Sequence, residues 1–181
     1  IVLNKLDWAL HAQGLNFVRY ADDFVILCKT RNAAERAKIF VVDLLDQMDL
    51  PLNLEKTRVG FIADSFEFLG FKISSHGPKI GNKAIERLKD KVRSHTIRSR
   101  NLDHDVIVRL NRVIRGTANY FAPAFANGAY DFRTLDKFIR RRVRSMKLTR
   151  IHRSDNYRIR TKHIANMGLL SLYDLYHAAK E

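Results

Sequence analysis

The early part of the chain alternates short hydrophobic segments with polar turns. Residues 17–20 and 24–28 are rich in aromatic and β-branched side chains, which are typical of strands. Only Ala21, Asp22 and Asp23 separate the two segments. The pattern therefore predicts a β-hairpin with a tight turn.

A helix and a second pair of strands are predicted next. Residues 32–48 carry apolar side chains at the spacing of one buried helix face, with Thr30 as the N-cap and Pro51 as the stop. Residues 58–62 and 66–73 then predict two more strands. The order of hairpin, helix and hairpin predicts an α+β layer, with the helix on one face of an antiparallel sheet. The apolar helix positions are Ala37, Val41, Leu44 and Met48.

The pattern changes after Gly77-Pro78, and the periodicity of the following segments is helical. We therefore predict a boundary at residues 74–78, where Gly-Pro punctuates the chain. A helix is predicted at residues 83–98, and a second helix is expected to begin after Asp103, which can cap it. One more helix is predicted near residues 171–179.

The clearest helix is predicted at residues 131–149, because this segment has two distinct faces. One face is apolar and the other is a row of cations, both at helical spacing. The helix is therefore expected to bury the first face in a bundle and to present the second outward. The apolar positions are Leu135, Phe138, Ile139, Val143 and Met146. The cations are Arg133, Lys137, Arg140, Arg141 and Arg144.

Charge is distributed unevenly along the chain, whose formal net charge is +14. Residues 1–82 contain 10 lysines and arginines and 10 acids, whereas residues 83–160 contain 21 and 7. A basic field confined to one segment suits phosphate binding, because neutralised phosphates release their counterions. The alternative is a solvated basic surface that keeps the protein in solution.

Composition excludes several other classes. The hydrophobic fraction of 46% is that of a globular protein. The single cysteine, Cys28, cannot build a disulfide framework or a cysteine-based zinc site. No apolar run in the sequence approaches the roughly 18 residues of a membrane span, and the first residues lack the layout of a signal peptide. The composition fits a protein of the reducing cytoplasm that is not associated with a membrane.

Asp22 and Asp23 are the candidate metal-binding residues. Two adjacent carboxylates on a turn between hydrophobic strands are held in fixed geometry, and their oxygens suit Mg²⁺. Two such ions can hold the attacking and leaving oxygens of a phosphoryl transfer. The alternative is an ordinary polar turn, which is the commoner role of an Asp-Asp pair. The hydrophobic frame on both sides is what favours a metal site here.

In this frame, the sequence Tyr20-Ala21-Asp22-Asp23 resembles the palm hairpin of the reverse-transcriptase family. The resemblance implies that Asp22 and Asp23 are metal-binding catalytic aspartates. It also implies that Tyr20 and Ala21 lie near the incoming nucleotide and the primer end.

Two downstream segments resemble later parts of the same family, in the same order. Residues 52–57 resemble the segment whose lysine assists the departure of pyrophosphate as a general acid, which implies that role for Lys56. Residues 68–71 resemble the primer grip, a tight hairpin that steers the primer 3′ end. Without the family, an exposed loop lysine and a core strand with a glycine bend explain these segments equally well. The implied primer-proximal residues are Phe68, Leu69 and Gly70.

The basic segment resembles the maturase-specific thumb, or domain X, of group II intron proteins. Residues 115–121, Arg-Gly-Thr-Ala-Asn-Tyr-Phe, and residues 132–140 carry this likeness. It implies an α+β fold: the C-terminal part of a reverse-transcriptase palm at residues 1–78, then an all-α helical-bundle thumb at 79–160. A helical tail is expected at residues 161–181, and the cations of the 131–149 helix are expected to bind nucleic acid.

The resemblance implies RNA-directed DNA polymerase activity in a complete protein that aids intron splicing and mobility. The implied partners are intron RNA, an RNA template with a DNA primer, and dNTPs, and the implied cofactor is Mg²⁺. The implied location is a cytoplasm of bacterial or organellar type, in association with RNA or the nucleoid. Two alternatives stay open. One is an RNA-binding splicing cofactor without polymerase activity, and the other is a reverse transcriptase of the retron or phage-defence type.

One expected part of the palm is not identifiable. The family places a further catalytic aspartate on a strand well upstream, whereas only 21 residues precede Asp22. Asp7 is the one candidate, but its surroundings predict an amphipathic helix, and we do not assign it the role. We therefore expect a piece of a longer protein, whose two-metal site is completed by an aspartate that this chain lacks. Alone, the chain is expected to be inactive as a polymerase.

Overall fold

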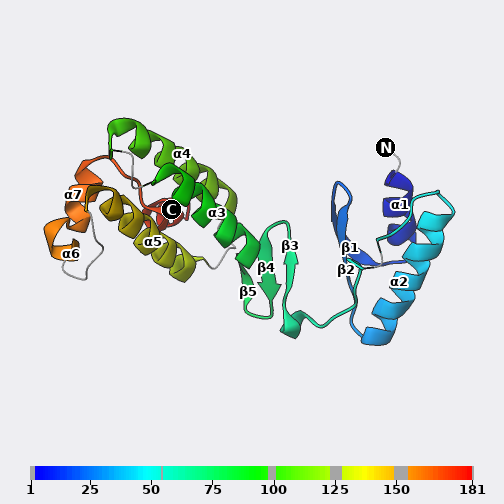
Figure 1. The fold of residues 1–181 in the computed structure, drawn as a ribbon. Coiled ribbons are helices and arrows are strands. Elements are labelled where there is room, and N and C mark those ends of the chain that lie inside the picture. The colour runs from blue at the N-terminus through cyan, green and yellow to red at the C-terminus, as the bar shows by residue number, and fades with distance from the viewer. Residues whose placement is uncertain (1–2, 54, 98–100, 123–127, 149–154, 181) are drawn as a thin grey trace. The chain divides into compact units, whose positions relative to one another are not determined.

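The computed structural model describes residues 3–53, 55–97, 101–122, 128–148 and 155–180 (Figure 1). Contacts divide the chain into two compact units, Ile1–Leu69 and Gly70–Glu181. Each unit has a separate hydrophobic core, as expected when two parts of a chain bury their apolar side chains independently.

The first unit packs two helices on a β-hairpin (Figure 1). Helix α1 (Asn4–Ala12) precedes strands β1 (Asn16–Tyr20) and β2 (Asp23–Leu27), which pair antiparallel. Helix α2 (Arg31–Asp46) follows. Side chains alternate between the two faces of the strands, and one face supplies the apolar residues that meet the helices. The buried core residues are Leu6, Leu10, Val41 and Leu45, with Phe17, Phe24 and Ile26 packed against them.

The structure confirms the predicted hairpin and the helix that follows it. Thr30 caps α2 through its hydroxyl, which accepts a hydrogen bond from a backbone N–H of the first turn at 3.2 Å. Ala37, Val41 and Leu45 are buried, because they lie four residues apart on one helix face. Leu44, which was predicted for the buried row, packs at the edge of the core.

The prediction of a strand at residues 58–62 is wrong. Those residues form no strand; a 3-10 turn, η1 (Ile62–Asp64), precedes the short strand β3 (Phe66–Phe68). Phe61 and Ile62 are 57% and 50% exposed, so little of the protein covers them. Strand formation depends on such packing more than on backbone preference, and the apolar composition of this segment alone does not make a strand.

The boundary predicted at residues 74–78 is the turn of another hairpin. Strands β4 (Phe71–Ser74) and β5 (Gly77–Ile80) pair antiparallel, with Ser74 opposite Gly77. Gly77 has a φ of 93°, which glycine adopts without steric cost. The Gly-Pro signal therefore marks a tight turn, and the division between the compact units lies earlier in the chain.

The second unit contains a helical bundle. Helices α3 (Asn82–His95), α4 (His104–Phe121) and α5 (Ala129–Lys147) form its centre (Figure 1). Asp103 caps α4 as predicted, because its carboxylate accepts a hydrogen bond from a first-turn N–H at 2.9 Å. None of the described helices is long and apolar enough to cross a membrane. Two predicted helix ends lie outside the described residues, at Arg98 and Thr149.

The last helices pack on the bundle and do not form a separate tail. They are α6 (Asp155–Arg158), α7 (Thr161–Asn166) and α8 (Leu172–Ala178). The helix predicted near residues 171–179 is α8. The bundle's core takes in three side chains of this segment that are at most 1% exposed: Ile164, Leu172 and Tyr176.

Candidate functional site

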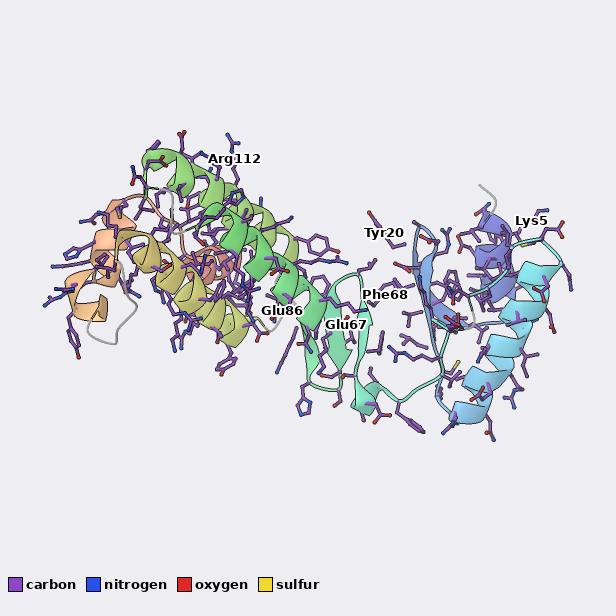
Figure 2. All side chains as sticks on the ribbon, viewed as in Figure 1. Lys5, Tyr20, Glu67, Phe68, Glu86 and Arg112 are labelled. Atoms are coloured by element: carbon purple, nitrogen blue, oxygen red, sulfur yellow. The ribbon has the colours of Figure 1, made fainter. Side chains whose placement is uncertain are left out.

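Asp22 and Asp23 lie at the tip of the β1–β2 hairpin. Tyr20 is opposite Asp23 in the ladder, so Ala21 and Asp22 are the two central residues of the turn. Ala21 has a φ of 55°, whereas Asp22 is not among the described residues with positive φ. The first central residue of the turn therefore lies in the left-handed region, and the second does not. Both carboxylates are exposed to solvent, and Tyr20 beside them is 67% exposed (Figure 2).

Arg19 braces this turn through its guanidinium. Two of its nitrogens bind the Asp7 carboxylate, with Nε 2.7 Å from Oδ1. The third nitrogen, Nη1, donates a hydrogen bond to the carbonyl of Ala21 at 2.7 Å. The Arg19 and Asp7 side chains are only 24% and 27% exposed. One side chain therefore ties the turn to helix α1.

Asp7 lies on a helix, as the sequence predicts. The hydrogen bond from Arg19 holds the pKa of the Asp7 carboxyl below its ordinary value, and the same contact raises the pKa of Arg19. Both groups are therefore charged at neutral pH, in a bidentate pair of the strong kind. The Asp7 carboxylate binds Arg19, which in turn binds the turn, so Asp7 helps to hold the turn in place.

The aspartate pair at the turn is not joined by a third acid within the described part of the chain. No three His, Cys, Asp or Glu side chains gather there in a way that could hold a metal ion. Asp22 and Asp23 supply hard oxygen donors of the kind that Mg²⁺ prefers. Their chemistry fits part of a magnesium site.

Lys56 lies in a turn after α2, and its side chain is exposed. Asn53 organises this turn: its Oδ1 accepts a hydrogen bond from the Lys56 N–H at 3.2 Å, and its carbonyl accepts one from Thr57 N at 3.0 Å. No hydrogen bond or ion pair between described residues joins Lys56 to the aspartate pair. Leu54, in the same segment, lies outside the described residues.

The Phe-Leu-Gly-Phe segment forms a second tight turn. Leu69 and Gly70 have φ values of 50° and 78°, the φ pattern of a type I′ hairpin turn. A Cβ on Gly70 would lie 3.4 Å from the ring of Phe121 at the end of α4. Phe71 continues this contact, with its ring centroid 5.0 Å from that of Phe121. Phe68, before the turn, is half-buried (Figure 2).

The cationic row predicted on α5 faces away from the core. On the opposite face Leu135, Ile139 and Val143 are at most 2% exposed, so the two predicted faces of this helix are confirmed. Within the described part of the chain, none of the five cations of the row forms a salt bridge. Their positive charge is therefore not neutralised by described acids.

The members of this row are held differently. Arg133 lies over the ring of Tyr173, with Cζ 4.3 Å from the centroid, and donates to its hydroxyl. Arg144 donates to the carbonyl of Ile159 at 2.8 Å, and burial lowers the pKa of its guanidinium. Lys137, by contrast, is exposed. The row thus combines cations that fasten the C-terminal segment with cations that are open to solvent.

An open groove of about 370 Å³ lies between α5 and the α7–α8 segment. Arg133, Lys137 and Arg140 line it from α5, and Ser171 and Asp174 line it from the other segment. Asp136 lines the groove as well, so its charged lining consists of three cations and two acids. This small excess of positive charge suits an anionic ligand better than a cationic one.

Asp136 is a buried residue that sequence reasoning missed. Its carboxylate, 3% exposed, accepts hydrogen bonds from Leu172 N at 2.9 Å, from Tyr173 N at 3.1 Å and from the hydroxyl of Ser171 at 2.9 Å. It therefore caps α8 from a neighbouring helix. Its spacing could have revealed it, because Asp136 lies four residues after Phe132 on the apolar face of α5.

Asn111 on α4 fastens the same segment from another side. Its side-chain amide donates to the carbonyl of Gly168 at 2.8 Å and accepts from Leu170 N at 2.9 Å. No local pattern distinguishes this asparagine from an exposed one, because its partners are 57 and 59 residues away.

Three aromatic residues at the end of α4 and the start of α5 differ in exposure. Phe121 belongs to the core, and Tyr120 is 52% exposed while stacking on Phe71 at 5.8 Å. Tyr130, at the start of α5, is 81% exposed. Tyr130 is therefore the most exposed of the three.

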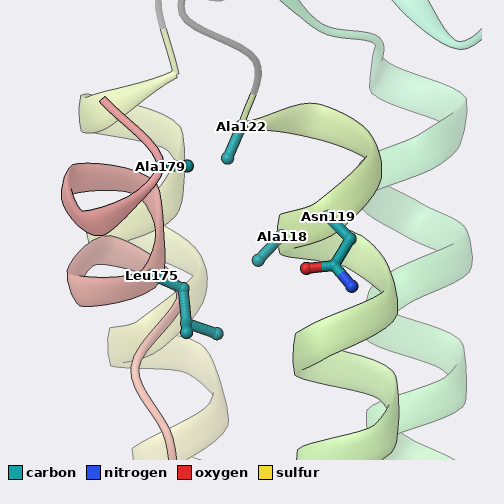
Figure 3. A pocket seen from close by; sticks show the side chains of 5 residues that line it. All are labelled: Ala118, Asn119, Ala122, Leu175 and Ala179. Carbon is teal, nitrogen blue, oxygen red and sulfur yellow. The ribbon is translucent and has the colours of Figure 1, made fainter. Parts of the chain in front are cut away.

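A second, smaller groove of about 290 Å³ lies between the end of α4 and α8 (Figure 3). Four of its five lining residues are apolar, and Asn119 is the polar one. Such a lining has no charged group that could bind phosphate or metal. The apolar residues are Ala118, Ala122, Leu175 and Ala179.

Comparisons with known proteins match two families, each over one part of the chain. Residues 1–73 match the reverse transcriptase (RNA-dependent DNA polymerase) family. Residues 85–164 match the group II intron, maturase-specific domain. No curated protein matches the chain. The first match contains the aspartate pair, and the second contains the cationic row of α5.

Proposed function

The chain belongs to the group II intron reverse transcriptase and maturase family, and we propose that its two units have different functions. Members of this family act in intron splicing and mobility. The hairpin aspartates take part in Mg²⁺-dependent DNA synthesis on an RNA template, and the bundle binds RNA. The observation that carries the polymerase part is the exposed aspartate pair on a braced two-residue turn.

The carboxylates of Asp22 and Asp23 would hold Mg²⁺ at the tip of the hairpin. The bound metal supplies charge neutralisation and aligns the attacking and leaving oxygens of the phosphoryl transfer. Tyr20, exposed on the last position of β1, is placed to contact the incoming nucleotide, and Ala21 leaves space for the primer end.

Two further segments are assigned supporting roles. Lys56 donates a proton to the leaving pyrophosphate, which its exposed and flexible side chain allows. The turn at Phe68, Leu69 and Gly70 contacts the primer strand, because a tight turn of fixed φ can present its backbone at close range.

The metal site is tested with Mn²⁺ as a paramagnetic probe for Mg²⁺. In ¹H–¹⁵N spectra of the full chain, Mn²⁺ should broaden the amide signals of Asp22 and Asp23 first. The double variant Asp22→Asn/Asp23→Asn should lose this broadening. The control Asp43→Asn/Asp46→Asn removes the same charge from exposed positions of α2 and should keep it. Broadening that avoids the turn in the unmodified chain would overturn the assignment.

We also propose that these 181 residues alone do not extend a primer, because two acids are too few for the two-metal site of the family. The expected result of a primer-extension assay on an RNA template is no product. Product that disappears in the Asp22→Asn/Asp23→Asn variant would contradict this proposal.

RNA binding is assigned to the exposed cations of α5. Lys137→Gln/Arg141→Gln removes two exposed charges spaced four residues apart, and Lys83→Gln/Arg87→Gln removes a matched pair from α3. Fluorescence anisotropy with a structured RNA should show a larger loss of affinity for the α5 pair. Equal losses would mean that net charge, and not this face, determines binding.

The second candidate function is that of an RNA-binding splicing cofactor without polymerase activity. The unneutralised cations on α5 favour it, since they need no metal site. It predicts that Asp22→Asn/Asp23→Asn changes neither RNA affinity nor splicing in the complete protein. The retron or phage-defence type is not proposed, because the maturase-specific match covers residues 85–164.

A further inference from the structure

Arg19 uses all three guanidinium nitrogens within a small region of the first unit. Nε and Nη2 bind the two carboxylate oxygens of Asp7, and Nη1 donates to the carbonyl of Ala21. A guanidinium is planar and rigid, so fixing two of its nitrogens also fixes the direction of the third. The Asp7 contact therefore determines where Arg19 meets the turn.

The group that Arg19 meets belongs to the peptide directly before Asp22. Ala21 has a φ of 55°, a conformation that L residues other than asparagine and aspartate seldom adopt. The carbonyl of Ala21 and the N–H of Asp22 share one planar peptide unit. A hydrogen bond to that carbonyl consequently restrains the backbone from which the Asp22 side chain projects.

The anchor of this arrangement is rigid. Asp7 lies on α1 between Leu6 and Leu10, which are both 0% exposed and pack in the core with Val41. Such fully buried neighbours restrict movement of the helix. The restraint on the turn is therefore transmitted from the core of the unit and does not depend on a mobile surface group.

We infer that Arg19, held by Asp7, is a positioning residue that orients the Asp22–Asp23 turn for metal binding. The inference deepens the proposed function and rests on it, because it concerns how the proposed metal ligands are placed. A residue that only joined α1 to the hairpin would need the contact with Asp7 alone. Arg19 also donates a hydrogen bond to the carbonyl of Ala21, and this second contact supports a positioning role.

The test uses charge changes of opposite sign in the full chain. Arg19→Gln removes a positive charge near the aspartates, and Asp7→Asn removes a negative one. If electrostatics alone acted, Mn²⁺ affinity at the turn would rise in the first variant and fall in the second. If positioning acts, affinity falls in both, and we expect a loss of roughly threefold to tenfold in each. Arg19→Lys keeps the positive charge but lacks the planar, bidentate guanidinium, so its Mn²⁺ affinity should also fall.

Order parameters of the backbone amides supply the second measurement. The amide of Asp22 should have an S² of about 0.85 in the unmodified chain and should fall toward about 0.6 in all three variants. Core amides of β1 and β2 should be unchanged.

Two control variants separate positioning from general softening of the unit. Glu35→Gln breaks the exposed Arg31–Glu35 pair on α2, whose atoms are 3.8 Å apart, and Val41→Ala loosens the core without touching the turn. Glu35→Gln should keep the Mn²⁺ affinity and the Asp22 order parameter. Val41→Ala leaves the contacts of Arg19 with Asp7 and Ala21 in place, so it should change both quantities less than the Arg19 variants do. The inference is overturned if Val41→Ala matches the Arg19 variants, or if Arg19→Gln binds Mn²⁺ more tightly.

Failure of the proposed function gives a different result. If the unmodified chain does not bind Mn²⁺ at the turn, the metal assignment fails while the order parameters still decide the positioning role. An unchanged Asp22 order parameter in Arg19→Gln, Arg19→Lys and Asp7→Asn would then reject the positioning role as well.

Discussion

Asp136 shows at the scale of one residue how a buried charge is satisfied in a basic helix. Its carboxylate accepts hydrogen bonds from two backbone N–H groups and one hydroxyl at the start of α8. Asp136→Asn places an amide N–H against at least one of these donors. We expect the free energy of unfolding of the second unit to fall by roughly 1–3 kcal/mol, the cost of leaving buried groups unpaired.

This loss is measured by urea unfolding of the full chain, followed by the circular-dichroism signal of the helices. The matched control is Asp174→Asn, which removes the same charge from an exposed position in the first turn of α8. It should change stability much less. Equal losses in the two variants would show that total charge matters more than the hydrogen bonds of Asp136.

Acid should weaken the first unit through Asp7. Its pKa is lowered by the Arg19 hydrogen bond, so the contribution of the pair is fully present above the ordinary value of 3.8 and is lost as pH falls through the lower, folded-state pKa. The fluorescence of Trp8, the chain's single tryptophan and a neighbour of Asp7 in this unit, follows this loss. Asp7→Asn should be less stable than the unmodified chain at neutral pH, with the difference shrinking toward pH 2.

The prediction would be contradicted by an acid transition that is the same in Asp7→Asn as in the unmodified chain but changes in Glu35→Gln. That would assign the transition to surface carboxylates in general. The sequence alone predicted that Asp22 and Asp23 lie at a hairpin turn and that the cations of α5 share one helix face, because the spacing of these residues is local. It missed Arg19, Asp136 and Asn111, because their contacts join residues 12 to 59 positions apart.

At the scale of elements, two glycines should respond oppositely to alanine. Gly116 lies within α4, and an added Cβ would meet nothing within 4 Å. Alanine has the higher helix propensity, so Gly116→Ala should stabilise the bundle by about 0.5–1 kcal/mol. Gly70→Ala should destabilise it, because Gly70 has a φ of 78° and lies against Phe121.

Thermal unfolding followed at the helical signal compares these two variants directly. A Gly116→Ala variant with an unchanged or lower midpoint would mean that α4 is constrained in a way that its open surface does not reveal. A Gly70→Ala variant with a raised midpoint would mean that the turn relaxes to accept a side chain.

Element prediction succeeded where one face of a segment is buried and failed where burial depends on distant neighbours. The periodicity of α2 and α5 is visible in the sequence because the core selects every third or fourth residue. Residues 58–62 are equally apolar, but Phe61 remains 57% exposed and forms no strand. The Gly-Pro pair was taken as a boundary, yet it lies inside a hairpin and not between the two units.

At the scale of the whole molecule, charge and core divide at nearly the same place. Residues 1–69 contain 8 lysines and arginines and 10 acids, whereas residues 70–181 contain 25 and 9. The second unit also has its own buried core. The sequence predicted the change in charge, but the exact division follows from which side chains pack together, and composition does not contain that information.

Residues 70–181 should therefore fold alone and retain the RNA affinity of the full chain. The logarithm of the binding constant should fall linearly with the logarithm of salt concentration, with the same slope for both proteins, because the first unit brings no excess of cations. Lys137→Gln/Arg141→Gln should reduce that slope by about 0.7 to 0.9 for each phosphate that the variant no longer neutralises. Anisotropy titrations at several salt concentrations measure it, after circular dichroism has shown that the isolated unit is helical. A folded 70–181 protein that binds RNA weakly, or without salt dependence, would move the RNA site away from α5.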